Sequence, residues 1–287
     1  MKPPAFGYHD PRTVADAITL LGTLDNARLL AGGQSLMPML NMRYVLPDHV
    51  IDLNGIDDLS FIRDDGVALE IGAMTRQRDI EFSAQARSRC PLLHEAIQHV
   101  GHRQTRNRGT LGGSLCHLDP SAELVTVAAA LDAVVSVAGA HGNREIAFAD
   151  FAQGYMTTAL APDELLTGAR FPLWRTGHGH AFVEFARRHG DFAVVSAAAL
   201  LETDGAKITR ASLTLGGVGP APLRMGGIEQ ALTGQTPSEV LFRELCESCR
   251  AIDAMDDVHA PQAYRRQLAV TLSRRALMQA HARVHHD

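Results

Sequence analysis

The chain of 287 residues contains only four cysteines: Cys90, Cys116, Cys246 and Cys249. So few thiols in a chain of this length do not form the disulfide framework of a small secreted domain. Only Cys246 and Cys249 lie close in sequence, and a structural zinc or iron–sulfur site needs about four ligands. We therefore expect no metal site in this chain and interpret the Cys246–Cys249 pair as half-buried structural thiols on a helix.

The chain also lacks an excess of basic residues and a long apolar run. Its 27 Lys and Arg against 32 Asp and Glu give a formal net charge of −5, whereas nucleic acids and anionic membranes need a concentrated basic surface. The longest apolar stretch, 124–140, is interrupted by Asp132 and falls short of a membrane span. Residues 1–10 hold two prolines and no apolar signal-peptide segment. We expect a cytoplasmic protein with no membrane span and no nucleic-acid partner.

The apolar pattern predicts strands and helices along the whole chain. Strands are expected at 28–31, 49–53, 67–73, 134–138, 145–148, 165–171, 193–201 and 208–215. Helices are expected at 13–21, 88–100, 121–131, 226–233, 238–250 and 262–281. This order is not a regular βαβ alternation, so it favours an α+β fold. The segment 173–180, rich in glycine and histidine, is the best candidate for a domain boundary.

Two glycine-rich segments are the most informative features of the sequence. The first reads AGGQSLMP at 31–38, and the second reads TLGGSLCHLDP at 110–120. Each abuts an apolar run, leads toward an expected helix and offers consecutive backbone N–H groups without bulky side chains, which is what a phosphate-bearing cofactor needs. Neither contains a lysine, which favours recognition by the backbone over a Walker-type site.

We expect the two segments to clamp a pyrophosphate. The backbone N–H groups of residues 32–35 and the Ser35 hydroxyl would lie on one side, and those of residues 112–114 on the other. Hydrogen bonds to charged acceptors contribute about 1.5–3 kcal/mol each, so five or six would retain the cofactor without a covalent link. From the pattern alone, two tight turns without a ligand remain the alternative.

A series of motifs resembles the FAD-binding (medium) subunits of molybdenum hydroxylases, the family of the xanthine dehydrogenase and carbon monoxide dehydrogenase medium subunits. The motifs are AGGQSLMP at 31–38, RNRGTLGGS at 106–114 continuing to Asp119-Pro120, DELL at 163–166 leading to Phe171-Pro172, RRHGDFA at 187–193, LGGVGP at 215–220, and the pair YRR at 264–266 and LSRRAL at 272–277. They occur in the family's order, from about residue 4 to residue 282.

The resemblance implies an α+β fold with two domains. Residues 1–175 would form a two-lobed FAD-binding domain of the vanillyl-alcohol-oxidase-like type, divided near 55–60, and residues 176–287 a C-terminal sheet-and-helices domain. FAD would lie between the lobes with its ring facing the C-terminal domain. No catalytic residue is expected, because electron transfer through a flavin needs no dedicated protein base.

The resemblance also implies partners. A small subunit would carry 2Fe-2S clusters, a large subunit would carry the molybdenum cofactor, and this chain would pass electrons through FAD to an external electron acceptor. The assembly would be a dimer of heterotrimers. The four cysteines agree with this division, because they are too few to hold the clusters.

Carried over residue by residue, the resemblance gives the FAD site. Glu123 would bond a ribose or ribityl hydroxyl, Leu165 or Leu166 would pack on the isoalloxazine, and Phe192 would stack beside it. Ser114 stands where the family usually has Asn, and Glu123 where it usually has Asp. The expected cofactor-binding residues are Ala31, Gly32, Gly33, Gln34, Ser35, Leu36, Thr110, Leu111, Gly112, Gly113, Ser114, His117, Asp119, Glu123, Leu165, Leu166, Asp191 and Phe192.

Two other functions stay open at this point. A self-contained flavin oxidoreductase would need its own substrate pocket and catalytic side chains, and no such set stands out in the sequence. A scaffold subunit with a degenerate FAD site would be consistent with the departures at Ser114 and Glu123. A purified chain that releases FAD on denaturation would exclude the scaffold.

Overall fold

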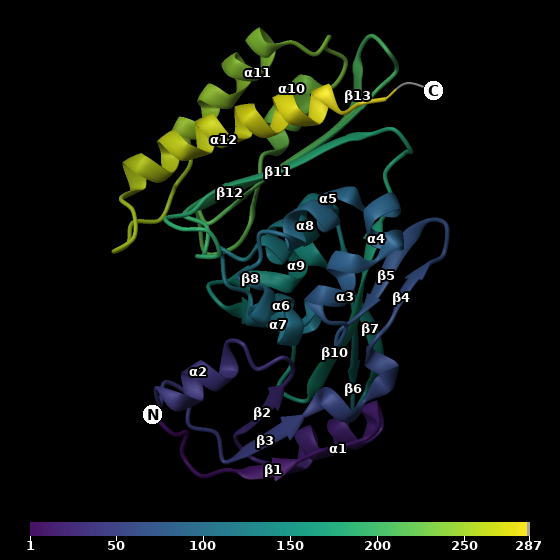
Figure 1. Cartoon of the computed structure of the whole chain (residues 1–287), viewed down its shortest axis with the longest axis vertical. Helices are drawn as coiled ribbons and strands as arrows, with labels where there is room; N and C mark the ends of the chain where they lie inside the picture. The colour runs from purple at the N-terminus through teal and green to yellow at the C-terminus, as the bar shows by residue number, and fades with distance from the viewer. Residues whose placement is uncertain (286–287) are drawn as a thin grey trace.

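The computed structural model describes residues 1–285, which form three parts stacked along the long axis (Figure 1). Each part has a sheet of its own, with three, five and four strands from the N-terminal to the C-terminal part, and a two-stranded sheet is added in the middle. Within the described residues, no helix is both long and apolar enough to cross a membrane. The mixture of helices and largely antiparallel sheets agrees with the expected fold class.

The N-terminal lobe is a small parallel sheet with two helices. Its elements are β1 (Gly7–His9), α1 (Val14–Thr23), β2 (Ala27–Leu30), α2 (Leu36–Asn41) and β3 (His49–Asp52), with strand order β1-β3-β2. Helix α1 begins after Thr13, whose hydroxyl oxygen accepts a hydrogen bond from the Asp16 N–H. The 3-10 turns η1 (Leu53–Gly55) and η2 (Asp57–Leu59) lead into the middle lobe.

The middle lobe is an antiparallel sheet with helices on one side. The sheet has the order β4 (Ile62–Asp64), β5 (Ala68–Gly72), β10 (Glu164–Pro172), β6 (Val134–Gly139) and β7 (Gly142–Ala147), and β8 (Ala152–Gly154) pairs with β9 (Thr157–Thr158). The helices are α3 (Gln77–Phe82), α4 (Ala84–Arg89), α5 (Pro91–Ile97), α6 (Arg103–Arg108), α7 (Leu111–His117), α8 (Glu123–Ala130) and α9 (Phe148–Phe151).

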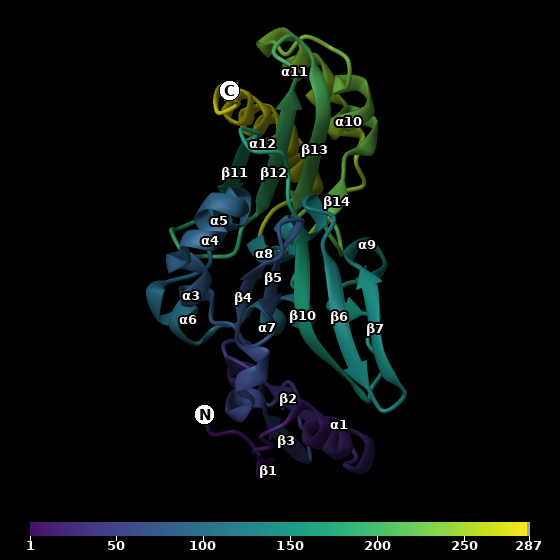
Figure 2. The ribbon, with the colours of Figure 1, turned by 90° about the vertical axis from the view of Figure 1, so that its right-hand side faces the viewer.

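The C-terminal part is a four-stranded antiparallel sheet that is covered on both faces. Its elements are β11 (Gly179–Phe185), β12 (Val195–Thr203), β13 (Ile208–Gly216), β14 (Leu223–Arg224), α10 (Gly226–Leu232), α11 (Glu239–Cys246), η3 (Glu247–Ala251) and α12 (Gln262–Ala282). The helices α10 to α12 cover one face, and α5 and α8 of the middle lobe pack against the other. Figure 2 shows this sheet directly above the middle sheet.

Strand β12 explains how the middle and C-terminal parts are joined. Its residues alternate between two apolar cores: Ala197 and Ala199 belong to the core under the C-terminal helices, and Ala198 and Leu200 belong to the core of the middle lobe. Period-two alternation sends successive side chains to opposite faces. Because both faces are buried, the strand is apolar at nearly every position.

The structure differs from the predictions at several places. The helix expected at 88–100 is two helices, α4 and α5, because Pro91 cannot continue the first and instead starts the second. The second glycine segment is not an open loop but the beginning of helix α7. Strand β11 begins at Gly179, so the last two residues of the candidate boundary segment 173–180 already belong to the C-terminal sheet.

Candidate cofactor site

The structure brings the two glycine segments into contact although they are far apart in sequence. A Cβ atom at Gly32 would overlap the carbonyl oxygen of Arg108 and lie 2.8 Å from the Cα of Gly109. A Cβ atom at Gly113 would lie 3.5 Å from the Cβ of Ala31. The backbones therefore pass each other at a distance that only glycine permits at position 32.

The first glycine segment, 31–38, contains backbone N–H groups that donate no hydrogen bond within residues 1–285. Gly33 has a φ of +72°, a conformation that glycine adopts without strain. Among the described residues, none accepts a hydrogen bond from the N–H groups of residues 32–35, which lie between β2 and α2. Ser35 occupies the N-cap position of α2, but its side chain makes no capping hydrogen bond. Four N–H groups and one hydroxyl are thus free to bind a ligand.

The second segment uses its backbone donors within the chain. The N–H groups of Leu111, Gly112, Gly113 and Ser114 donate to Thr75 O, Ala73 O, Thr110 Oγ1 and Thr110 O, respectively, at 2.8–3.2 Å. The expectation that residues 112–114 offer free N–H groups is therefore not met, because this segment starts a helix capped by Thr110. Its glycines serve close packing instead: a Cβ atom at Gly112 would lie 2.7 Å from the Cβ of Ala73.

A polar network that the sequence pattern does not predict ties the two segments together. The half-buried Arg76 guanidinium donates hydrogen bonds to the carbonyl of Arg108 and to Asn54 Oδ1. Asn54 Nδ2 in turn donates to the carbonyl of Ala31 at 2.9 Å. Burial, followed by the nearby charge of Arg108, lowers the pKa of Arg76. The Arg76 guanidinium is thus bonded to the same carbonyl group that the backbone of Gly32 touches, and the charge of Arg108 acts on it.

Three further expected residues lie at or just beyond the end of helix α7. His117 is its last residue, and burial lowers the pKa of this imidazole. Asp119 Oδ1 accepts a hydrogen bond from the Ser121 N–H at 2.9 Å, so this carboxylate stabilises the turn between α7 and α8. Glu123 begins α8 and is 5% exposed. Burial, with the charges of Glu184 and Asp119 adding to it, raises the pKa of Glu123 to about 8.

Leu165 and Leu166 are buried in two different cores. Leu165 packs with the residues of the N-terminal lobe, and Leu166 packs with those of the middle lobe. Each side chain is only 2% exposed. Neither offers an open surface on which an isoalloxazine could lie, because strand β10 runs between the two cores rather than along the surface.

Asp191 and Phe192 lie on the surface loop that joins β11 to β12, and Phe192 is 62% exposed. A Cβ atom at Gly190 in this loop would overlap the imidazole ring of His102. His102 is the N-cap of α6, and the other end of α6 is Arg108, which touches Gly32. At 1.5 Å per residue, the six residues of α6 span about 9 Å. One short helix thus links the glycine segments to the loop that carries Phe192.

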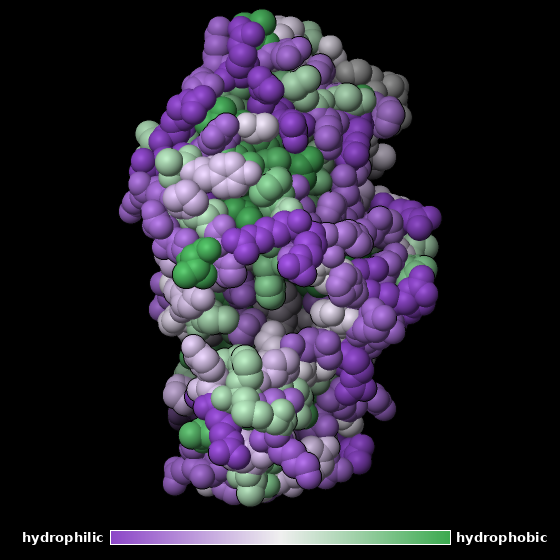
Figure 3. Space-filling model, turned by 60° about the vertical axis from the view of Figure 1, so that its left-hand side comes forward, coloured by the Kyte–Doolittle hydropathy of each residue, from purple (hydrophilic) through white to green (hydrophobic). Residues whose placement is uncertain are grey.

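The face of the molecule shown in Figure 3 is hollowed between its lower and middle parts.

Among residues 1–285, no group of three or more His, Cys, Asp or Glu side chains is arranged to hold a metal ion. All four cysteines are free thiols, and Cys246 and Cys249 are fully buried rather than half-buried. Burial raises the pKa of Cys246 to about 12, so this thiol stays protonated near neutral pH.

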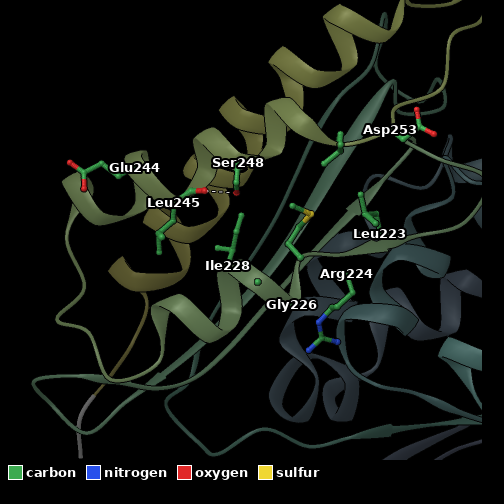
Figure 4. A pocket seen from close by; sticks show the side chains of 11 residues that line it. Leu223, Arg224, Gly226, Ile228, Glu244, Leu245, Ser248 and Asp253 are labelled. Atoms are coloured by element: carbon green, nitrogen blue, oxygen red, sulfur yellow. Dashed lines mark hydrogen bonds between the residues drawn. The ribbon is translucent and has the colours of Figure 1, made fainter.

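A separate cavity of about 560 Å³ lies in the C-terminal domain (Figure 4). It is lined between α10 and η3 by apolar side chains such as Met225, Ile228 and Leu245, and by Arg224. Arg224 is paired there with Glu229 and Asp132. None of the expected cofactor-binding residues lines this cavity.

Comparisons of the sequence and of the structure both find subunits of multi-subunit dehydrogenases. The family model described as FAD binding domain in molybdopterin dehydrogenase matches residues 4–174, and the model described as CO dehydrogenase flavoprotein C-terminal domain matches residues 180–280. Caffeine dehydrogenase subunit beta from Pseudomonas sp. (strain CBB1) is 38% identical, with 100% of this chain and 98% of the relative covered. The carbon monoxide dehydrogenase medium chain from Afipia carboxidovorans is 36% identical, with 99% of each covered.

Among solved structures, this chain is similar to a chain of carbon monoxide dehydrogenase from Hydrogenophaga pseudoflava. The TM-score is 0.96 at 34% sequence identity, and the match covers 99% of this chain and 100% of the other. A chain of quinoline 2-oxidoreductase from Pseudomonas putida 86 gives a TM-score of 0.95 at 32% identity, with coverage of 99% and 100%.

Proposed function

This chain belongs to the family of FAD-binding medium subunits of molybdenum hydroxylases, and from that premise we propose that residues 31–35 hold the pyrophosphate of its FAD. The chain is the FAD subunit of a multi-subunit, molybdenum-dependent dehydrogenase, with iron–sulfur and molybdenum sites on partner subunits. Bound FAD supplies the redox chemistry, and the chain's own residues bind, orient and shield it.

The observation that carries this proposal is the set of N–H groups at residues 32–35, which have no acceptor within residues 1–285, next to the carbonyl of Arg108 that Arg76 binds. A pyrophosphate bears about two negative charges, and consecutive backbone N–H groups form an anion-binding concavity. Gly32 adds room, since its missing side chain lets the backbone approach closely. Arg76 and Arg108 supply positive charge, and Arg76 already orients the carbonyl of Arg108. The donor set therefore fits a dianionic group.

The structure changes the roles that we propose for the other expected FAD-binding residues. Ser114 would contribute its hydroxyl rather than its N–H, because its N–H donates to Thr110. Glu123, whose pKa is raised, would keep its proton and donate a hydrogen bond to a ribose or ribityl oxygen rather than accept a hydrogen bond from a hydroxyl. Phe192 and Asp191 would border the ring from the C-terminal domain. For Leu165, Leu166, His117 and Asp119 we propose support of the surrounding backbone, given their burial and local contacts.

Finer features of the assembly are also proposed. We infer that electrons enter from a 2Fe-2S cluster of the small subunit and leave to an external acceptor, and that the complex is a cytoplasmic dimer of heterotrimers. The four free cysteines support a reducing compartment.

We further propose a domain division into 1–175 and 176–287. The first domain would be split near 55–60 and be of the vanillyl-alcohol-oxidase-like type. The turns η1 and η2 between the first two sheets support the split.

The substitution Gly33→Asp tests the pyrophosphate site. It puts a carboxylate beside the free N–H groups, and we expect loss of bound FAD with the fold retained. Aspartate tolerates a positive φ better than most residues, so the backbone at +72° should persist. Flavin per chain is measured by absorbance after denaturation, and folding by circular dichroism.

The matched control is Gly234→Asp, at a glycine with a φ of +82° and open space around it. This variant should keep FAD. Stoichiometric FAD in Gly33→Asp would overturn the placement of the pyrophosphate. A wild-type chain that is purified folded but never takes up FAD would instead support the scaffold alternative.

A further inference from the structure

Arg265, in the first turn of helix α12, is a buried arginine that is only 2% exposed. It belongs to the YRR motif at 264–266, to which the pyrophosphate site assigns no role. Arginine is almost never fully buried in a protein unless its donors are paired. The partners of this guanidinium therefore indicate what it does in the fold.

The guanidinium of Arg265 joins three segments of the C-terminal part. Its Nη1 donates hydrogen bonds to the carbonyl groups of Val194 and Gly217, and its Nη2 donates to Asp257 Oδ2 at 2.7 Å. Val194 lies directly before β12, and Gly217 lies directly after β13. Asp257 Oδ1 accepts hydrogen bonds from two N–H groups of its own loop, 257–260, so this carboxylate is held independently of the arginine.

The contact at Arg265 extends to the middle lobe through Gly217. This glycine has a φ of +71°, and a Cβ atom there would lie 2.6 Å from the carbonyl oxygen of Val194. A larger residue would push apart the two carbonyl groups that share the guanidinium. The N–H of Gly217 donates to the carbonyl of Pro120 at 2.8 Å, in the turn between α7 and α8.

The loop 186–194, which joins β11 to β12, is closed at its base. The N–H of Val194 donates to the carbonyl of Phe185 at 2.7 Å. The ring of Phe185 lies edge-on to that of Tyr264, with a distance of 5.9 Å between the centroids. Helix α12 therefore contacts both ends of the loop with adjacent residues, Tyr264 at the first end and Arg265 at the second.

Two more contacts hold the loop between its ends. Arg187 Nη2 donates to the carbonyl of His259 at 3.0 Å. The imidazole of His102 lies where a Cβ atom at Gly190 would be. Phe192, by contrast, is 62% exposed, so little packing holds its ring. The fixed backbone around Phe192 therefore sets the position of this side chain.

We propose that Arg265 is a positioning residue, which fixes the backbone that carries Phe192 and thereby the place of this ring beside the isoalloxazine. The inference rests on the proposed function, in which Phe192 borders the flavin. A side chain on a mobile loop loses conformational freedom when it contacts a ligand, so a loop that is fixed beforehand holds the ligand better. A guanidinium suits this role, because its planar set of donors holds several groups in one geometry.

Arg265→Gln in the FAD-loaded chain tests this role. Glutamine is too short to reach all three partners, so the base of the loop should loosen. We expect FAD to stay bound, because residues 32–35 hold its pyrophosphate. The visible circular dichroism of the flavin, which reports the surroundings of the ring, should shift toward that of Phe192→Ala. The matched control is Arg266→Gln, because Arg266 is the next residue of α12 but donates to the carbonyl of Ile252 at 2.8 Å. This control should keep the wild-type dichroism.

The double variant distinguishes a positioning role from a merely structural one. If Arg265 acts through Phe192, then Arg265→Gln should add no further change to the dichroism of Phe192→Ala. Wild-type dichroism in a destabilised Arg265→Gln would overturn the proposal, because the arginine would then only stabilise the domain. A full additional change in the double variant would also overturn it, since the arginine would then act on the flavin by another route.

Asp257→Asn takes the place of Arg265→Gln if the latter does not fold. It removes the charge that Arg265 Nη2 binds and keeps the arginine, so the dichroism should shift in the same direction but less. An unchanged dichroism in Asp257→Asn would then count against the positioning role. Failure of the proposed function gives a different result, namely a folded wild-type chain that takes up no FAD.

Discussion

The backbone of Gly32 lies directly against the carbonyl group of Arg108, with no room for a Cβ atom between them. The same carbonyl accepts a hydrogen bond from Arg76, which also bonds Asn54, and Asn54 bonds the carbonyl of Ala31. This closed ring of contacts joins the N-terminal lobe to the middle lobe at the point where the cofactor's pyrophosphate is proposed to bind.

The substitution Gly32→Ala should disrupt the contact between the backbone at position 32 and the Arg108 carbonyl. The added methyl group overlaps the Arg108 carbonyl, so one of the two backbones must shift, which typically costs about 1–3 kcal/mol. We expect a lower melting temperature and loss of most bound FAD. Gly154→Ala is the matched control, since a Cβ atom there meets nothing within 4 Å. Full flavin content in Gly32→Ala would mean that the contact has no part in binding.

Arg76→Gln should weaken FAD binding and the contact between the lobes at the same time. The variant loses the hydrogen bonds to Asn54 and to the Arg108 carbonyl, at a cost of about 1–3 kcal/mol if these groups find no other partner. It also removes one positive charge near residues 32–35. FAD dissociation constants and urea unfolding measure the two effects. Arg243→Gln, at an exposed arginine of α11, should change neither.

Much of the fold follows from local patterns in the sequence. The alternation at 67–73 corresponds to β5, and the capping threonine at position 13 marks the start of α1. Helix α7 was not predicted, because a Gly–Gly pair has low helix propensity. In the structure, the Thr110 cap and the packing of Gly112 on Ala73 outweigh that cost. Such a contact between distant segments cannot be inferred from neighbouring residues.

The same limit applies to the cofactor site. The first glycine segment was identifiable because all its donors lie within one short stretch of sequence. Arg76 and Asn54 were not identified, since their roles depend on partners 22 to 32 residues away. The available signal was their position just after the predicted strands 67–73 and 49–53. The free or occupied state of each N–H group likewise depends on tertiary structure.

Glu123→Gln should change the pH dependence of stability. Burial raises the folded-state pKa of Glu123 from 4.5 to about 8, so the native state binds its proton more tightly than the unfolded state. This stabilising contribution is complete below pH 4.5 and is lost as the pH rises toward 8, at about 1.4 kcal/mol per unit at most. The glutamine variant should therefore gain stability relative to the wild type as the pH rises from 5 to 8.

Urea unfolding at several pH values measures this effect. Glu239→Gln is the control, because Glu239 occupies the same first-turn position of its helix but is exposed. A stability difference between Glu123→Gln and the wild type that does not vary with pH would show that the buried carboxyl is charged throughout.

Glu184→Gln should lower the pKa of His99 across the domain boundary. The hydrogen bond between Glu184 Oε1 and His99 Nδ1, at 3.2 Å, is the main cause that raises the pKa of His99 above 6.5. The stabilising effect of this pair is present below pH 6.5 and lost as the pH rises through the folded-state pKa. A titration of His99 by NMR measures the shift. Glu145→Gln, on exposed β7, should leave His99 unchanged.

Strand β12 carries a mechanical consequence. Because Ala198 and Leu200 enter the middle core while Ala197 and Ala199 enter the C-terminal core, a swing between the two parts would have to pull apolar side chains of one strand out of one of two cores. The buried faces of β12 therefore oppose a hinge between the middle and C-terminal parts at this strand.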